Sequence, residues 1–331
     1  MKVCIFGAGA IGGHLAGRLA KGGAEVSVLA RGAQLAAIRA KGLRVLAADG
    51  DIHVHPRAEA DPAALGPQDA VVVCTKVPAL GDVARAIGPL LGPETSVTFV
   101  TNGIPWWYFH AHGGAEEGQR VPEADPGDVV WDSIGPKRAI GGVIYSACSV
   151  PEPGVIEVTS RTNKLLLGEP DGSRSDRTVA LATAFKQGGM PCSVSADIRS
   201  DVWAKLITNL SNAPVCVLTR RHMQDTFADA VVREAAVTVV RESLAIAAAM
   251  GRPVGGAPEE RINQSAQLAH KPSILQDLEA GRPMEVDSLF QAPLRLAREK
   301  GVPAPTLSLL VAMVAQVAEA AGLYRRSAQD G

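Results

Sequence analysis

The 331-residue sequence lacks the features that mark several common classes of protein. It has no long basic run and a formal net charge of -1, so composition gives no reason to expect a nucleic-acid partner. No apolar run reaches the roughly 18 residues that a membrane-spanning helix needs. There is no internal repeat, and hydrophobic residues make up 47% of the chain. These properties predict a globular protein, long enough for two domains, with no membrane partner.

Cysteine is scarce and scattered. The sequence has five cysteines, Cys4, Cys74, Cys148, Cys192 and Cys216, without any C-x-x-C pair. Four of the five lie in apolar runs. Buried, reduced thiols are usual in such runs. The pattern favours a reducing compartment, and we expect a cytoplasmic protein. The glycine spacing in the opening stretch MKVCIFGAGAIGG fits a folded domain better than a signal peptide.

The start of the chain carries a glycine pattern typical of dinucleotide binding. The apolar run KVCIF predicts a buried parallel strand, GAGAIG follows it, and a helical stretch leads to a second strand at 25–30. In this spacing the glycines allow a tight turn, close approach of a pyrophosphate and close helix–strand packing. The free N–H groups at the helix start attract phosphate. We predict cofactor contacts from the whole motif, which comprises Gly7, Ala8, Gly9, Ala10, Ile11 and Gly12.

The end of the second strand lacks the acid with which an NAD-specific site binds the ribose 2′-hydroxyl. The chain there reads Leu29, Ala30, Arg31 and Gly32. A guanidinium pairs bidentately with a 2′-phosphate, which a carboxylate would repel. We therefore predict NADP(H) as the cofactor, bound through Arg31. The alternative is that Arg31 is an ordinary solvated loop residue.

Two further strands, at 70–76 and 96–103, flank another helical stretch. This alternation predicts an α/β fold with a doubly wound parallel sheet of Rossmann type. Ligands of such sheets lie beyond the carboxyl ends of the strands. Lys76 and Asn102 fall at two of these ends, so both are candidate binding residues.

The apolar pattern changes its period along the chain. From residue 139 it predicts strand-rich pieces with hairpin-like spacing, followed by a helix and a short strand. After residue 197 the repeat becomes helical, without strand signals. We predict an N-terminal Rossmann-type domain over 1–197 and an all-helical C-terminal domain over 198–331.

A stretch rich in glycine, proline and charge, residues 110–137, predicts a long surface loop. His110, His112, Glu116 and Glu117 lie close together in it. No further ligand stands at a fixed distance from the two histidines, so we predict no metal site.

One predicted helix carries an unexpected polar stripe. In WAKLITNLSNAP, residues 203–214, Lys205 and two asparagines alternate with large apolar residues. Burying an ammonium group costs several kcal/mol unless a partner is near. A solvated helix face would explain one lysine, but it explains the whole stripe less well. Pro214 removes a helical hydrogen bond and usually bends the chain.

Taken in order, these segments resemble the ketopantoate reductase family over essentially the whole chain. The resemblance rests on GAGAIG, on Lys76, on TNG at 101–103, on WAKLITNLSNAP, and on KPSILQDLEAGRPMEVD at 271–287. It implies an NADPH-dependent oxidoreductase that reduces 2-dehydropantoate, a small 2-oxo acid, in pantothenate biosynthesis.

The resemblance also implies roles for single residues. Lys205 and Glu285 would be the catalytic pair. Asn102, Asn209 and Ser273 would bind the substrate; Arg31 and Lys76 would bind the cofactor, and Asn102 would contact it as well.

The chemistry of 2-oxo acid reduction accounts for a buried lysine. Hydride reaches the carbonyl carbon while negative charge builds on the oxygen, so a protonated Lys205 would stabilise that oxygen and donate the proton. Glu285 would orient the ammonium group or bind a substrate hydroxyl. The alternative is that Glu285 is an ordinary surface acid.

The sequence departs from the family pattern at two places. Position 213, where the family usually has a second amide, is Ala213. Asn212 lies about 20° from Lys205 around a helix that turns about 100° per residue, so we expect it to replace that amide. The second departure is the aromatic cluster 105–110, PWWYFH, which either packs in the core or covers the substrate pocket.

The sequence is therefore compatible with three functions. The first is ketopantoate reduction, and the second is reduction of another 2-oxo acid by a related reductase or β-hydroxyacid dehydrogenase. The third is a non-catalytic NADP-binding protein, which would need none of the residues Asn102, Lys205, Ser273 and Glu285. The sequence also leaves open whether the protein forms a homodimer.

Overall fold

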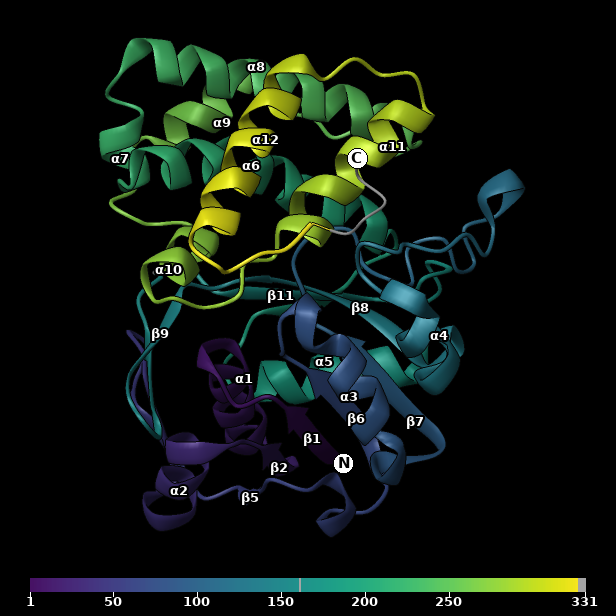
Figure 1. Cartoon of the computed structure of the whole chain (residues 1–331). Coiled ribbons are helices and arrows are strands. Elements are labelled where there is room, and N and C mark those ends of the chain that lie inside the picture. The colour runs from purple at the N-terminus through teal and green to yellow at the C-terminus, as the bar shows by residue number, and fades with distance from the viewer. Residues whose placement is uncertain (161, 327–331) are drawn as a thin grey trace. The chain divides into compact units, whose positions relative to one another are not determined.

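The structure, a computed structural model, describes residues 1–160 and 162–326 (Figure 1). It divides into two compact units. The first comprises Met1–Thr101 and Trp106–Ile198, and the second comprises Asn102–Pro105 together with the chain from Arg199 onward. The short segment Asn102–Pro105 therefore packs with the second unit, although the residues on both sides of it belong to the first.

An eight-stranded sheet, in the order β12-β11-β8-β7-β6-β1-β2-β5, forms the centre of the first unit. The strands from β5 to β8 are parallel, and β11 joins antiparallel to β8. Numbered in chain order, the parallel strands run 3-2-1-4-5-6, as in dinucleotide-binding sheets. The predicted doubly wound fold is confirmed. The strands are β1 (Lys2–Phe6), β2 (Glu25–Leu29), β5 (Arg57–Glu59), β6 (Gln68–Val73), β7 (Leu91–Phe99), β8 (Ala139–Tyr145), β11 (Lys164–Gly168) and β12 (Cys192–Val194).

The strand order reverses between β1 and β6, which places the glycine loop after β1 at the switch point of the sheet. Val3, Cys4 and Ile5 of β1 are fully buried, as expected for a parallel strand covered on both faces. The first unit contains the helices α1 (Ala10–Lys21), α2 (Gly32–Lys41), α3 (Leu80–Ala86), α4 (Val129–Ile134) and α5 (Asp176–Gln187).

A second sheet, in the order β4-β3-β10-β9, packs against α1. Its strands are β3 (Leu43–Leu46), β4 (Ile52–Val54), β9 (Cys148–Glu152) and β10 (Val155–Val158). The approach is close because two helix positions lack side chains. A Cβ atom on Gly13 would lie 2.6 Å from Ile156 Cγ1, and one on Gly17 would lie 2.6 Å from Val45 Cγ2.

The hairpin-like spacing expected after residue 139 holds for one pair of strands. β9 and β10 pair antiparallel across a tight turn, whereas β8 and β11 pair with each other in the large sheet. The sequence did not reveal β3 and β4, which are short and belong to the second sheet.

The aromatic cluster after Asn102 is buried. Trp106, Trp107, Tyr108 and Phe109 are each at most 1% exposed. The Trp106 ring packs edge-on against Phe99 at 5.2 Å and against Trp131 at 5.9 Å between centroids. These are the contacts of core packing, one of the two alternatives for the cluster.

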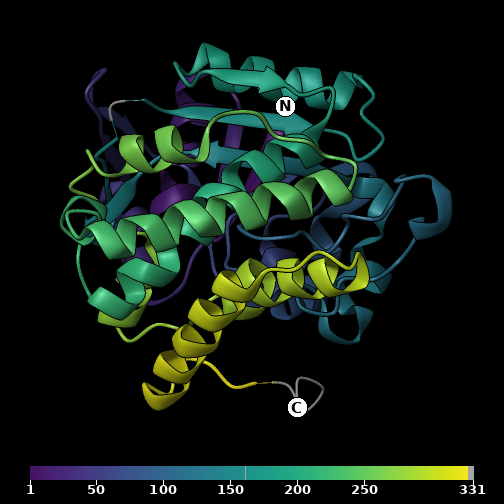
Figure 2. The ribbon, with the colours of Figure 1, turned by 90° about the horizontal axis from the view of Figure 1, so that it is seen from above.

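The second unit is helical, as predicted. Helices α8 and α12 contact each other, and both are seen along their length in Figure 2. Glu242 of α8 accepts hydrogen bonds from the N–H groups of Thr306 and Leu307 in the first turn of α12. The helices are α6 (Ile198–Thr219), α7 (Met223–Thr226), α8 (Ala230–Ala249), α9 (Pro258–Ser265), α10 (Ser273–Glu279), α11 (Ala292–Glu299) and α12 (Pro305–Ala320), with a π-helical segment at Asp287–Gln291.

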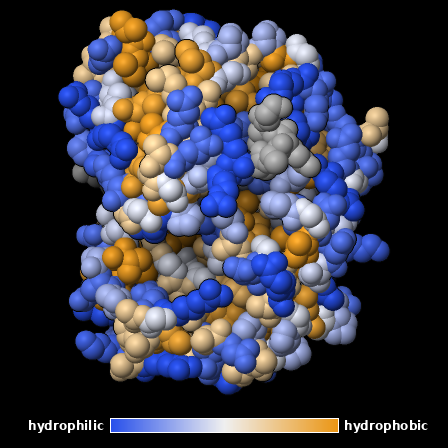
Figure 3. All heavy atoms as spheres, viewed as in Figure 1, coloured by the Kyte–Doolittle hydropathy of each residue, from blue (hydrophilic) through white to orange (hydrophobic). Residues whose placement is uncertain are grey.

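The surface is mixed in character. Hydrophilic residues cover much of the face in Figure 3, with hydrophobic residues in small groups between them. In the part of the chain that the structure describes, no helix combines the length and hydrophobicity needed to cross a membrane.

Candidate active site

The glycine loop between β1 and α1 depends on missing side chains at three positions. Gly7 has φ +100°, and a Cβ atom there would lie 2.8 Å from Thr75 Cγ2. A Cβ atom on Gly12 would lie 1.9 Å from the Gly7 oxygen. A Cβ atom on Gly9 would meet no atom within 4 Å, so this position faces open space. Two glycines thus allow the turn to pack, and the third leaves room for a pyrophosphate to approach.

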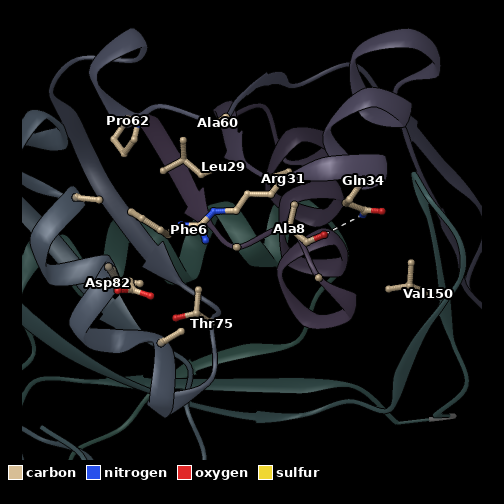
Figure 4. Close-up of a pocket in the computed structure, with 16 residues that line it drawn as sticks. Phe6, Ala8, Leu29, Arg31, Gln34, Ala60, Pro62, Thr75, Asp82 and Val150 are labelled. Carbon is tan, nitrogen blue, oxygen red and sulfur yellow. Dashed lines mark hydrogen bonds between the residues drawn. The ribbon is translucent and has the colours of Figure 1, made fainter. Parts of the chain in front are cut away.

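A cavity of about 420 Å³ opens beside this loop (Figure 4). Of the residues predicted to bind cofactor, Gly7, Ala8, Gly9 and Arg31 line it. Among the residues that the structure describes, Arg31 is the one positively charged residue that lines the cavity, and it directly precedes α2 in the chain. The cavity is therefore the candidate site of a dinucleotide cofactor.

Other predicted cofactor residues lie outside this lining. Gly12 is buried in α1, where it packs on Gly7, and Ala10 and Ile11 form the first turn of that helix. Lys76 precedes a short 3₁₀ turn, Val77–Ala79, that follows β6.

Gln34 is a cavity residue that the sequence did not reveal. Its Nε2 donates to the Ala8 oxygen at 2.8 Å, and its Oε1 accepts from the Gly154 N–H at 2.9 Å. It thus ties the glycine loop to the turn between β9 and β10. Thr75, Asp82 and Val150 also line the cavity without having been predicted (Figure 4). No local signal marks such residues, because the strands that bring them together are far apart in sequence.

Three residues predicted for catalysis and substrate binding lie together in the second unit. Lys205 Nζ donates to Asn102 Oδ1 at 3.0 Å. Glu285, which is 5% exposed, acts on Lys205 through its charge. Lys205 itself is partly buried on α6, where Trp203, Leu206 and Ile207 pack into the core.

The surroundings change how readily Lys205 gives up its proton. Burial lowers the pKa of Lys205 from 10.5 to about 8, and the nearby Glu285 carboxylate opposes that shift. A lysine with this pKa is largely protonated at neutral pH, yet it loses its proton far more readily than an exposed one. Those are the properties of a general acid.

Asn209 and Ser273, two further residues predicted to bind substrate, lie on different helices of the second unit. Asn209 is partly buried, one helical turn after Lys205 on α6. Ser273 is exposed and begins α10.

Asn212 is held differently from what we expected. It is 4% exposed, its Nδ2 donates to Ser265 Oγ at 2.9 Å, and its Oδ1 accepts from Ser211 Oγ at 3.3 Å. The amide therefore joins α6 to α9. This geometry argues against Asn212 as a replacement for the amide missing at Ala213, which is itself 2% exposed.

Over residues 1–160 and 162–326, no group of three or more His, Cys, Asp or Glu side chains is arranged to hold an ion.

The first unit thus has a glycine-loop cavity on a Rossmann sheet, and the second has a partly buried lysine held by an amide near a carboxylate; these are the features of a dinucleotide-dependent oxidoreductase. The chain belongs to the ketopantoate reductase family. The model of the family described as "Ketopantoate reductase PanE/ApbA" matches residues 3–172, and that of its C-terminal domain matches residues 197–318.

Similar proteins agree with this assignment. A 2-dehydropantoate 2-reductase of Mesorhizobium japonicum is 44% identical over 98% of this chain and 100% of its own. A solved structure from Ralstonia solanacearum MolK2, assigned to the ketopantoate reductases, is 38% identical with a TM-score of 0.90, over 97% of this chain and 99% of that one. D-mandelate dehydrogenase, solved with NADH and anilino(oxo)acetate, shares the fold at 19% identity, with a TM-score of 0.80 over 98% and 100% of the two chains.

The contacts of Asn212 predict the effect of its removal. We expect Asn212→Ala to leave the KM for the oxo acid within about twofold and to lower the free energy of unfolding by roughly 1–3 kcal/mol, because Ser265 loses its buried partner. Urea denaturation and steady-state kinetics measure the two quantities. A raised KM at unchanged stability would instead assign Asn212 to substrate binding.

Proposed function

We propose that this protein reduces 2-dehydropantoate to pantoate, with NADPH as the hydride donor. The observation that carries the proposal is the contact of Lys205 with Asn102 beside the buried Glu285. A non-catalytic nucleotide-binding protein would have no use for this cluster. The proposal is also supported by the name of the relative from Mesorhizobium japonicum, with which this chain aligns over almost its whole length.

The residues of the cluster divide the work of the reaction. When bound, the reduced nicotinamide supplies the hydride. Lys205 Nζ donates the proton to the carbonyl oxygen as negative charge develops there. Asn102 holds the ammonium group through its Oδ1, which fixes the direction of that donation. Glu285 favours the charged form of Lys205, so that a proton is available at neutral pH.

The substrate's carboxylate needs donors that add no further charge beside Lys205. The amide of Asn209 and the hydroxyl of Ser273 meet that need, and we assign them to substrate binding. For the cofactor, we assign the pyrophosphate to the glycine loop and the 2′-phosphate to Arg31, with Lys76 and Asn102 nearer the nicotinamide end.

A second candidate is the reduction of a different 2-oxo acid. It is favoured by Ala213, which offers a methyl group where the family usually has an amide, and by the engagement of Asn212 with Ser265. NADPH oxidation, followed by absorbance with a panel of 2-oxo acids, separates the two. The highest kcat/KM with ketopantoate supports the first candidate, and a higher value with another oxo acid supports the second.

We place the enzyme in the cytoplasm, because all five of its cysteines are free thiols. A homodimer is also part of the proposal, and light scattering on the purified protein tests it.

The cofactor assignment rests on Arg31. We expect NADPH to bind more tightly than NADH, and Arg31→Ala to weaken NADPH binding by roughly 10- to 100-fold with little effect on NADH, because a bidentate phosphate contact is lost. Fluorescence titration gives the dissociation constants. Arg39→Ala is the matched control, since Arg39 lies on α2, the helix that Arg31 precedes, but pairs with Glu59. Equal affinity for the two cofactors in the unmodified protein would refute the assignment.

Removal of the proton donor tests the proposed role of Lys205. We expect Lys205→Ala to lower kcat by roughly 10²- to 10⁴-fold, the usual range for general acid–base catalysis. NADPH affinity should change little, because the cavity beside the glycine loop is untouched. Near-normal turnover in the variant would show that Lys205 has a structural role only.

The pKa of Lys205 predicts how activity depends on pH. Oxo acid reduction needs the protonated form, so kcat should fall as pH rises through about 8. Glu285 raises this pKa, so in Glu285→Gln the fall should begin at lower pH. A pH profile of kcat at saturating substrates measures both. A profile in Glu285→Gln that is unchanged or shifted upward would contradict the charge coupling.

A further inference from the structure

The chain directly after Glu285 does not form a regular α-helix. Residues Asp287–Gln291 form a π-helical turn, in which the Ala292 N–H donates to the Asp287 oxygen, five residues back. The next residue, Pro293, has no N–H group. Such single π turns occur often at functional sites.

This local geometry leaves one carbonyl group without a donor from its own helix. In an α-helix the Ser288 oxygen would accept from Ala292, but that N–H is used by Asp287. In a continued π-helix its donor would be residue 293, which is a proline. The Ser288 oxygen instead accepts from the Ile104 N–H at 3.0 Å. A buried carbonyl is thus satisfied by the segment Asn102–Pro105.

Close approach of the two segments requires a glycine at position 103. Gly103 has φ +82°, a conformation that residues with a side chain rarely adopt. A Cβ atom there would lie 2.2 Å from the Ser288 oxygen and 2.5 Å from its carbonyl carbon. No rotation of a side chain relieves this contact, because both atoms belong to the backbone.

The contact joins two partners of Lys205. Asn102, directly before Gly103, accepts the hydrogen bond from Lys205 Nζ. Glu285, three residues before Ser288, lies in the segment that the contact anchors. The hydrogen bond from Ile104 to Ser288 therefore fixes Asn102 relative to the chain that carries Glu285, beside the same ammonium group.

We infer that Gly103 and Pro293 are positioning residues for this reaction: together they create the contact of Ile104 with Ser288, which holds Asn102 against Lys205. The inference rests on the proposed function of Lys205. Pro293 acts by withholding an N–H group, and Gly103 acts by admitting the Ser288 backbone.

The first test replaces Gly103. We expect Gly103→Ala to lower kcat by roughly tenfold or more, because misplacement by about 1 Å is enough for such losses. The dissociation constant for NADPH should stay unchanged. The fall of kcat with pH should begin at lower pH, since Lys205 loses an acceptor that favours its protonated form. Gly301→Ala is the matched control, because Gly301 also lies in the second unit, has φ +66° and has no atom within 4 Å of its Cβ position.

The second test replaces Pro293 and separates positioning from general damage. Pro293→Ala restores an N–H group within a helical run but removes part of a buried ring; because these changes oppose each other, the melting temperature should change little. The helix should then satisfy its own carbonyls, the Ile104 amide should lose protection from hydrogen exchange, and kcat should fall. Lower activity with little change in stability would not arise from a structural defect.

The outcomes distinguish failure of the positioning role from failure of the proposed function. Normal kcat in both Gly103→Ala and Pro293→Ala, while Lys205→Ala is inactive, would overturn the positioning role alone. Normal kcat in Lys205→Ala would overturn the proposed function. Loss of Ile104 protection together with loss of kcat in Pro293→Ala would support the inference, even if Gly103→Ala fails to fold.

Discussion

The need of the Lys205 ammonium group for partners is the constraint on which the catalytic cluster depends. A charge withdrawn from water is costly unless it is paired and hydrogen-bonded. Here one partner is a neutral amide, at 3.0 Å, and the other is a buried carboxylate. An amide acceptor holds the ammonium group without abolishing its acidity, whereas the carboxylate keeps it charged. Burial lowers the pKa of Lys205 and the Glu285 carboxylate opposes that shift, which leaves the pKa at about 8.

This constraint also explains an unusual division of the chain. Asn102 follows β7, the fifth of the six parallel strands in chain order, but it packs with the helical unit that contains Lys205 and Glu285. The ammonium group and both its partners therefore belong to one compact unit. In the proposed function, proton donation therefore depends on distances within that unit, whereas the glycine loop and Arg31 belong to the other. The residues proposed for proton transfer and those proposed for nucleotide binding therefore belong to different compact units of the chain.

The sequence predicted those features of fold and site that depend on local patterns. The glycine spacing and the apolar strands sufficed for the Rossmann sheet, and a lysine within an apolar helix marked the cluster. The position of Asn212 could not be predicted in the same way. Its angle places it on the face of Lys205, but seven residues also advance about 10 Å along a helix. At that point along α6, the Asn212 amide donates a hydrogen bond to Ser265 of α9. Gln34 was missed because its partner Gly154 lies 120 residues away.

Gly103 and Pro293 show how residues that weaken regular structure can build a site. A helix propensity scale assigns both residues an unfavourable free energy and no function. In this fold the proline removes the donor that the Ser288 carbonyl would otherwise have, and the glycine lets the Ile104 N–H reach that carbonyl. Neither residue provides a side-chain group for chemistry. In the proposed mechanism their effect passes through the backbone to Asn102, so that the orientation of Lys205 depends on one interrupted helical hydrogen bond and on one position without a side chain.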